Sequence, residues 1–130
     1  MAFIRFSTSL RTSRASTLVT AAGANATIKF YTGSAPANVD TAVTGTLLGT
    51  LTCGSTLGTV SNGVLTFGAI TGDSSVDATG AWGYARVATS GGVGLIDLDV
   101  GTSGTSIIMA AASAVQGASL DITSLVVTEA

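Results

Sequence analysis

Alternation between apolar and polar residues in short segments is the feature of this sequence that most constrains its fold. The segment GLIDLDV shows it most clearly, with Ile96, Leu98 and Val100 on one face and Asp97 and Asp99 on the other. A two-residue period is that of a β-strand, whose successive side chains point to opposite faces of a sheet. The segment therefore predicts a strand with one buried face and one solvated face.

Other segments follow the same period and are separated by glycine-rich or polar joints. We expect strands in the segments 27–32, 44–53, 63–70, 81–89 and 119–128, while 105–114 fits either a strand or a helix. Gly91 and Gly92 stand just before GLIDLDV and predict a hairpin with the preceding strand. The single proline, Pro36, predicts a turn in GSAPANVD, where Asn38 and Asp40 supply side-chain caps.

The alternation also predicts which side chains face the core. The residues expected to point inward are Ile28, Phe30, Leu47, Leu51, Cys53, Leu120, Ile122 and Val126. Gly49 interrupts its strand and leaves room for a close neighbour or a β-bulge. Cys53 is the only cysteine, so an intrachain disulfide is excluded, and no neighbouring cation activates its thiol. We expect Cys53 to be a buried, small apolar residue.

The N-terminal part of the chain follows a helical period instead. The residues at spacings that suit one helical face are Phe6, Leu10, Leu18, Val19 and Ala22. Ser7 or Ser9 suits the N-cap and Gly23 the C-terminal stop, which predicts a helix over residues 8–22. The many Ser and Thr residues within this segment lower its intrinsic helix propensity.

Together these elements predict a mainly β protein, an antiparallel β-sandwich or barrel of jelly-roll type with one short N-terminal helix. The length of 130 residues fits a single domain, 1–130. Within it we expect residues 1–25 to form an arm and helix, and residues 26–130 to form the β-domain.

Charge is unusually scarce, because only 9% of the residues are charged. Soluble domains carry about 25% charged residues, which keep their surfaces from associating. Here Thr, Ser, Gly and Ala must cover the surface. This composition is typical of a protein that works within an assembly, or of a very stable extracellular β-protein.

The charges are also distributed unevenly along the chain. The first 29 residues hold four bases (Arg5, Arg11, Arg14, Lys29) and no acid, a net charge of +4, and the remaining 101 residues hold one base and seven acids, a net charge of −6. This uneven distribution has two explanations. It is a chance excess in a short segment, or it indicates a basic N-terminal segment that docks on an acidic surface, its own or a partner's. Four dispersed bases without interleaved aromatic residues make a poor phosphate track, so we expect no nucleic-acid partner.

The sequence lacks the residues that most catalytic chemistry requires. It contains no histidine, which excludes a Ser-His-Asp or Cys-His nucleophile and an imidazole metal ligand. One cysteine excludes a structural zinc site within one chain, and no glycine-rich run ends in the Lys-Ser/Thr of a phosphate loop. We therefore expect no enzyme activity, no cofactor and no metal. No apolar run approaches the about 20 residues of a membrane helix, so no membrane partner is expected either.

Three weaker candidates for binding chemistry remain, each with a structural alternative. Asp97 and Asp99 share one strand face and suit a hard cation or a pair of carboxylates, but a solvated strand face explains them as well. Asp73 and Asp77 in the loop GDSSVDATG suit a calcium-binding loop, but the spacing and ligand set of an EF-hand are absent. Trp82, Tyr84 and Arg86 suit a sugar-stacking patch, or else packing in the core or at a subunit interface.

The segment IKFYTGSAPANVDTAVTGTLLGTLT resembles small virion proteins of tailed bacteriophages, in which a short N-terminal helix precedes similar strands. The later segment WGYARV is similar to an aromatic-Ala-Arg strand of these proteins. The resemblance covers residues 7–53 and, more loosely, 80–100. It implies a structural component of the particle, most like a head decoration (cement) protein, with no catalytic residues.

The resemblance implies the major capsid protein as partner and the outer head surface of the virion as location. A homo-oligomer, trimer or dimer, would cover the apolar faces that a small, Ala-rich core leaves exposed. The residues expected to contact partners are Arg5, Arg11, Arg14, Leu10, Leu18 and Trp82. A tail or neck component, or a carbohydrate-binding or adhesin module on the virion surface, remains the alternative.

Overall fold

The computed structural model describes residues 5–68, 70–73, 75–105, 107–109, 113–120 and 124–128. Within these residues the chain forms one α-helix, α1 (Thr8–Ala22), and eleven strands. The strands are β1 (Thr27–Tyr31), β2 (Leu47–Cys53), β3 (Gly58–Ser61), β4 (Val64–Phe67), β5 (Ile70–Thr71), β6 (Gly80–Ala81), β7 (Tyr84–Ala88), β8 (Gly94–Gly101), β9 (Ile107–Ile108), β10 (Ser113–Ala114) and β11 (Ser124–Thr128). The expected mainly β fold with one short N-terminal helix is confirmed.

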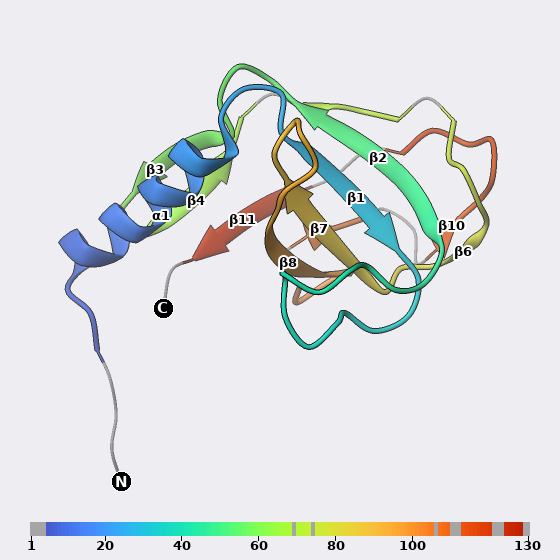
Figure 1. The fold of residues 1–130 in the computed structure, drawn as a ribbon, viewed down its shortest axis with the longest axis horizontal. Helices are drawn as coiled ribbons and strands as arrows, with labels where there is room; N and C mark the ends of the chain where they lie inside the picture. The colour runs from blue at the N-terminus through green and yellow to red at the C-terminus, as the bar shows by residue number, and fades with distance from the viewer. Residues whose placement is uncertain are drawn as a thin grey trace, which may run out of the picture.

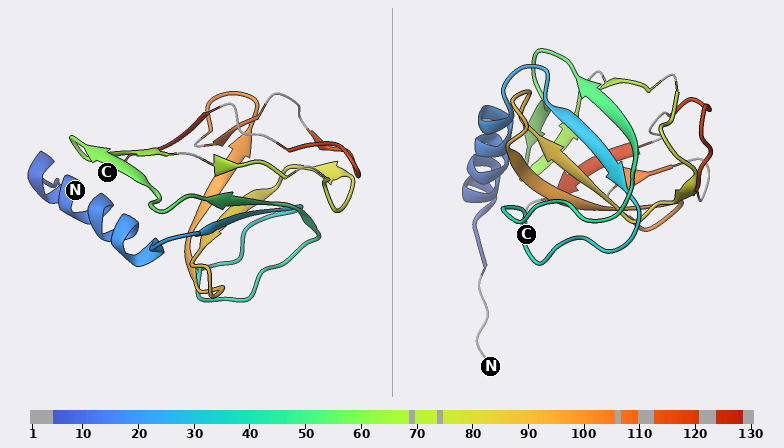
Figure 2. Two further views of the ribbon diagram at one scale, coloured as in Figure 1. Left: turned by 90° about the horizontal axis from the view of Figure 1, so that it is seen from above. Right: turned by 45° about the vertical axis from the view of Figure 1, so that its right-hand side comes forward.

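Nine of the strands form one curled sheet in the order β3-β4-β11-β9-β8-β7-β1-β2-β5. Neighbouring strands are antiparallel except β8 and β9, which run parallel, so the sheet is mixed. Figures 1 and 2 show the sheet curling into a half-barrel, with α1 lying along the β3–β4 hairpin at one end. The strands β6 and β10 pair separately at the other end.

The boundaries of α1 follow the cap residues expected from the sequence. The Ser7 hydroxyl accepts a hydrogen bond from the Leu10 N–H at 3.1 Å, so Ser7 is the N-cap. Gly23 ends the helix at a φ of 64° and donates its N–H to the Val19 carbonyl. Ala15 and Ala22 are buried, because small side chains let the helix approach the sheet closely.

The β3–β4 hairpin supports α1 and was missed in the sequence interpretation, which placed a strand only at 63–70. Its turn is Asn62-Gly63, and both residues have positive φ angles (52° and 77°), as a two-residue type I′ turn requires. The Gly63 N–H donates to the Thr12 hydroxyl of α1 at 2.9 Å. A Cβ at Gly63 would lie 2.9 Å from the Cβ of Arg11, so glycine permits this close packing.

The inner face of the central strands forms the core. Register pairs Ile28 with Leu51 and Val87, and Phe30 with Gly49 and Ala85. All of these apolar side chains are fully buried. Cys53 is buried as well, as expected. Leu120, also buried, meets the chain at Asp73 in an isolated bridge, whereas Ile122 lies outside the described residues.

A β-bulge in β2 corrects one expectation about the core. Phe30 pairs with Gly49 but Tyr31 pairs with Leu47, so Leu48 is an extra residue in the strand. The bulge turns Leu48 into the core, where it is fully buried, and leaves Leu47 only half-buried. The inward assignment of Leu47 was therefore wrong. Gly49 adjoins the bulge as expected.

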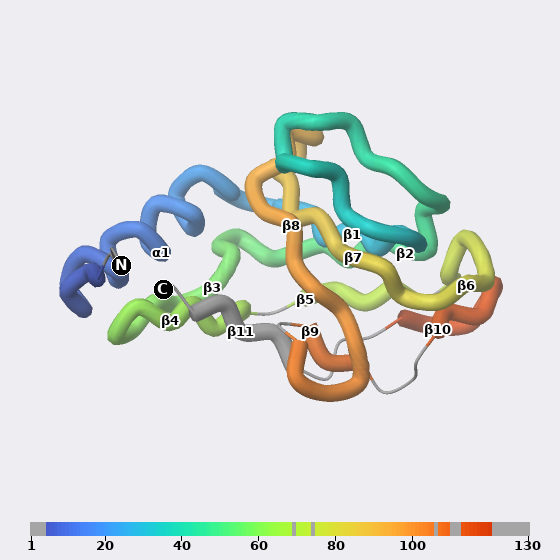
Figure 3. Tube along the Cα trace, turned by 90° about the horizontal axis from the view of Figure 1, so that it is seen from below, coloured from blue at the N-terminus to red at the C-terminus, as the bar shows by residue number. Residues whose placement is uncertain are grey.

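All residues of β7 are buried, so both faces of this strand are covered. The segment 32–46 between β1 and β2 folds back over the outer face of β1, β7 and β8, as Figure 3 shows for the teal part of the chain. Asp97 lies beneath this segment, with a side chain only 13% exposed. The expectation that Asp97 occupies a solvated face was therefore wrong, while Asp99 is exposed.

Candidate functional site

Three of the residues expected to contact partners are exposed at the N-terminal end of the chain, Leu10 and Arg14 on α1 and Arg5 just before it. Leu10 is 45% exposed, and Arg5 and Arg14 are exposed too. The Arg14 guanidinium carbon lies 4.5 Å from the centre of the Phe6 ring, and Phe6 is 36% exposed. A cation at this distance over an aromatic face is attracted by the ring quadrupole. Phe6, Leu10 and Arg14 therefore form an exposed patch, the helix patch, that is both apolar and basic.

Arg11 and Leu18 face a different way from the helix patch. Arg11 is half-buried against Gly63, its Nη2 donates to the Thr8 hydroxyl at 3.0 Å, and its buried Nε has no hydrogen-bond partner. Leu18 packs against the hydrophobic core. Both residues thus help to pack α1 against the rest of the protein.

Trp82 lies far from the helix patch. It follows β6, which lies at the opposite end of the molecule from α1 (Figure 1). Its ring meets Phe30 edge-on, with centroids 5.4 Å apart and an interplanar angle of 63°, and it is half-buried against the core. The structure therefore does not bring Trp82 together with the N-terminal residues.

A second candidate region lies under the segment 32–46, where Arg86 holds this segment to the sheet. Arg86 is only 7% exposed, and its Nε and Nη2 donate to the two carboxylate oxygens of Asp97 at 2.7 and 3.0 Å. Its Nη1 donates to the carbonyl oxygen of Thr41 at 2.7 Å. The hydrogen bond with Asp97 raises the pKa of Arg86, against the opposing effect of burial, so the guanidinium keeps its charge.

Tyr84 fixes the same segment at a second point. Its hydroxyl donates to the Thr44 carbonyl oxygen at 2.8 Å and accepts from the Thr44 N–H at 3.0 Å. Its ring stacks on Tyr31 with centroids 5.3 Å apart. The polar groups of Tyr84 and Arg86 are thus engaged with the chain's own backbone and with Asp97, rather than grouped around Trp82.

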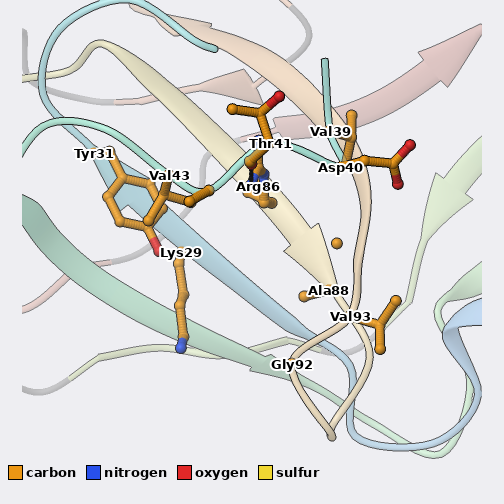
Figure 4. A pocket seen from close by; sticks show the side chains of 12 residues that line it. Lys29, Tyr31, Val39, Asp40, Thr41, Val43, Arg86, Ala88, Gly92 and Val93 are labelled. Carbon is orange, nitrogen blue, oxygen red and sulfur yellow. Dashed lines mark hydrogen bonds between the residues drawn. The ribbon is translucent and has the colours of Figure 1, made fainter. Parts of the chain in front are cut away.

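Between this segment and the sheet lies an open cavity of about 480 Å³ (Figure 4). We call it the loop groove; its lining residues are Lys29, Tyr31, Val39, Asp40, Thr41, Ala42, Val43, Arg86, Ala88, Gly92, Val93 and Gly94. The sequence interpretation named Lys29 only as one of four N-terminal bases and did not single out the valines. The length of the segment 32–46 was a signal for the loop groove. Connections this long without secondary structure are uncommon in compact domains and are often functional.

Two of the acidic residues considered as cation ligands, Asp97 and Asp73, use their carboxylates to hold the fold together. Asp97 is paired with Arg86. The Asp73 carboxylate accepts from the Thr50 N–H and the Ser75 N–H, both at 3.0 Å, and the Asp77 N–H donates to the Leu48 carbonyl. These contacts cover the outer edge of β2. In the described part of the chain, no three His, Cys, Asp or Glu residues are grouped so that they could hold a metal ion.

Comparison with known proteins finds no matching family model, no matching curated protein and no matching solved structure. Among the described residues, no helix is long and apolar enough to cross a membrane.

Proposed function

We propose that this protein is a non-enzymatic structural protein of a tailed-bacteriophage virion, a decoration or cement protein that binds the major capsid protein lattice on the outer head surface. The resemblance of residues 28–52 to small virion proteins supports the proposal. The scarcity of charged residues supports it, because an uncharged surface suits a protein that functions within an assembly.

The helix patch is the observation that carries the proposal. It places Phe6 and Leu10 in solvent beside the cationic Arg14, on the part of the chain that contains no acid. An exposed apolar surface flanked by charge is characteristic of a protein-binding site. An acidic lattice surface with an apolar depression would complement the helix patch in both charge and shape.

The mechanism would be thermodynamic rather than catalytic. A protein that binds the assembled lattice, but not its separated subunits, stabilises the assembly by mass action. Self-association into a trimer or dimer would present several helix patches to the lattice at once. The resulting avidity raises affinity without new contacts.

The proposal is tested by adding the purified protein to undecorated phage heads and heating them. We expect saturable binding and a higher temperature of head disruption, because the bound protein is released when the lattice dissociates. A reconstruction of the saturated particle should place the protein on the outer head surface. Density on the tail or neck instead, or heads that neither bind the protein nor gain thermal stability, would reject the proposal.

A further inference from the structure

The loop groove is lined by both apolar and charged side chains. Val43 on the covering segment and Val93 on the β7–β8 turn are 40% and 64% exposed. Lys29 projects from β1 beside Tyr31, as Figure 4 shows. The groove is therefore lined by two exposed apolar side chains and by the cationic Lys29.

The strand register explains why the Lys29 charge is not compensated. On the outer face Lys29 pairs with Thr50 of β2 and Arg86 of β7, and Arg86 in turn pairs with Asp97 of β8. Asp97 neutralises Arg86, because both carboxylate oxygens bind that guanidinium. Like charges opposite each other on neighbouring strands repel, so this pairing also removes a repulsion between Arg86 and Lys29.

Lys29 itself has no ion pair with any described residue. Asp40 also lines the groove, and Figure 4 shows its carboxylate pointing away from Lys29. The Tyr31 hydroxyl makes no hydrogen bond within the described residues and lies on the Lys29 side of the groove. An ammonium group and a phenol donor are therefore both available to an acceptor that enters the groove.

We propose that the loop groove binds an acidic peptide segment of a partner protein. An Asp or Glu carboxylate of that segment contacts the Lys29 ammonium and the Tyr31 hydroxyl. A neighbouring apolar side chain lies between Val43 and Val93. A free small anion would meet only one positive charge, whereas the exposed valines add apolar contact area for a peptide. This site uses no residue of α1 and does not depend on the proposed capsid function.

The test uses the isolated ¹⁵N-labelled protein and two peptides, acetyl-Val-Glu-Val-amide and acetyl-Val-Gln-Val-amide. Titration with the Glu peptide should shift the amide resonances of Lys29, Tyr31, Val43 and Val93. The Gln peptide should bind about fivefold more weakly, which corresponds to the upper range for a partly exposed ion pair. Lys29→Gln should reduce the affinity for the Glu peptide to that for the Gln peptide, while Lys29→Arg should retain most of it.

Arg14→Gln is the matched control, because it removes a cation of the helix patch and should leave peptide affinity unchanged. An unaltered urea midpoint of Lys29→Gln would show that its fold is intact. Equal affinity for the two peptides, shifts confined to other residues, or no shifts at all would overturn the proposal. So would acetate that binds the groove as tightly as the Glu peptide, or groove shifts that depend on protein concentration alone, which would indicate a second copy as occupant.

Discussion

Arg86 of β7 and Asp97 of β8 form a bidentate ion pair beneath the segment 32–46, with nitrogen–oxygen distances of 2.7 and 3.0 Å. Their side chains are 9% and 13% exposed, so the pair is largely withdrawn from water. The remaining guanidinium nitrogen, Nη1, binds the Thr41 carbonyl and so connects the pair to the covering segment. One interaction thus joins two strands and the segment above them.

Replacing Asp97 should destabilise the protein strongly. Asp97→Asn leaves the Arg86 charge buried without its counter-charge, and breaking such a pair costs about 3 kcal/mol. Asp99→Asn is the matched control on the same strand and the same face. Because Asp99 is exposed, the control should change stability by less than about 1 kcal/mol. Urea unfolding measures both, and similar losses for the two variants would contradict the structural role of the Arg86–Asp97 pair.

Gly63 should be far less tolerant of alanine than Gly91. Gly63 has a φ of +77°, and an added Cβ would lie 2.9 Å from the Arg11 Cβ. We expect Gly63→Ala to cost about 2 kcal/mol from backbone strain and displacement of α1. At Gly91 the nearest atom to an added Cβ is 3.8 Å away, so Gly91→Ala should stay within about 0.5 kcal/mol of wild type. Equal urea midpoints for the two variants would show that α1 does not pack on the hairpin as described.

The Cys53 thiol should react slowly with a thiol reagent in the native protein. The side chain is buried, and burial raises the pKa of the thiol above its ordinary value of 9.0, so little thiolate is present at neutral pH. Labelling should become rapid and stoichiometric when urea unfolds the chain. Rapid labelling of the native protein would contradict the inward orientation of Cys53.

The same thiol should make the free energy of unfolding depend on alkaline pH. The unfolded chain releases the Cys53 proton near pH 9.0, whereas the folded protein retains it to higher pH. The folded state then binds more protons, so its stability falls as the pH rises above about 8. Comparing wild type with Cys53→Ala by urea unfolding between about pH 7 and 10 isolates this contribution. A difference between the two proteins that stays constant across this range would contradict a raised thiol pKa.

Local signals made much of the fold predictable from the sequence. The bounds of α1 follow from Ser7 and Gly23, because cap residues act within a single turn. The inward positions of Ile28 and Phe30 follow from the two-residue period. The strand β3 was missed because GTVS has no apolar alternation, although Asn62-Gly63 is a strong hairpin signal on its own.

Features set by tertiary contacts were not predictable in this way. The bulge at Leu48 shifts the alternation by one residue, and only pairing with β1 reveals it. The period of GLIDLDV correctly places Asp97 on the outer face, but periodicity does not show that the segment 32–46 covers that face. The environment of Lys29 depends on the same coverage, so the loop groove could not be inferred from spacing.

Lattice binding is better tested by substitutions in the helix patch than by a deletion of the N-terminal segment. Deleting residues 1–22 would remove the buried Ala15 and Ala22 and so disturb the fold itself. Leu10→Ala and Arg14→Ala instead change exposed side chains. Val115→Ala is a matched control for Leu10→Ala, because Val115 is 59% exposed and follows β10 at the opposite end of the molecule from α1 (Figure 1).

Co-sedimentation of these variants with undecorated phage heads across a salt series tests the central claim most directly. Wild type and Val115→Ala should sediment with heads equally well. Leu10→Ala should bind about fivefold more weakly at every salt concentration, because it loses about 1 kcal/mol of apolar contact. Arg14→Ala should lose affinity mainly at low salt, where the attraction is least screened. Wild-type protein that stays in the supernatant, or helix-patch variants that bind as tightly as wild type, would contradict lattice binding through the helix patch.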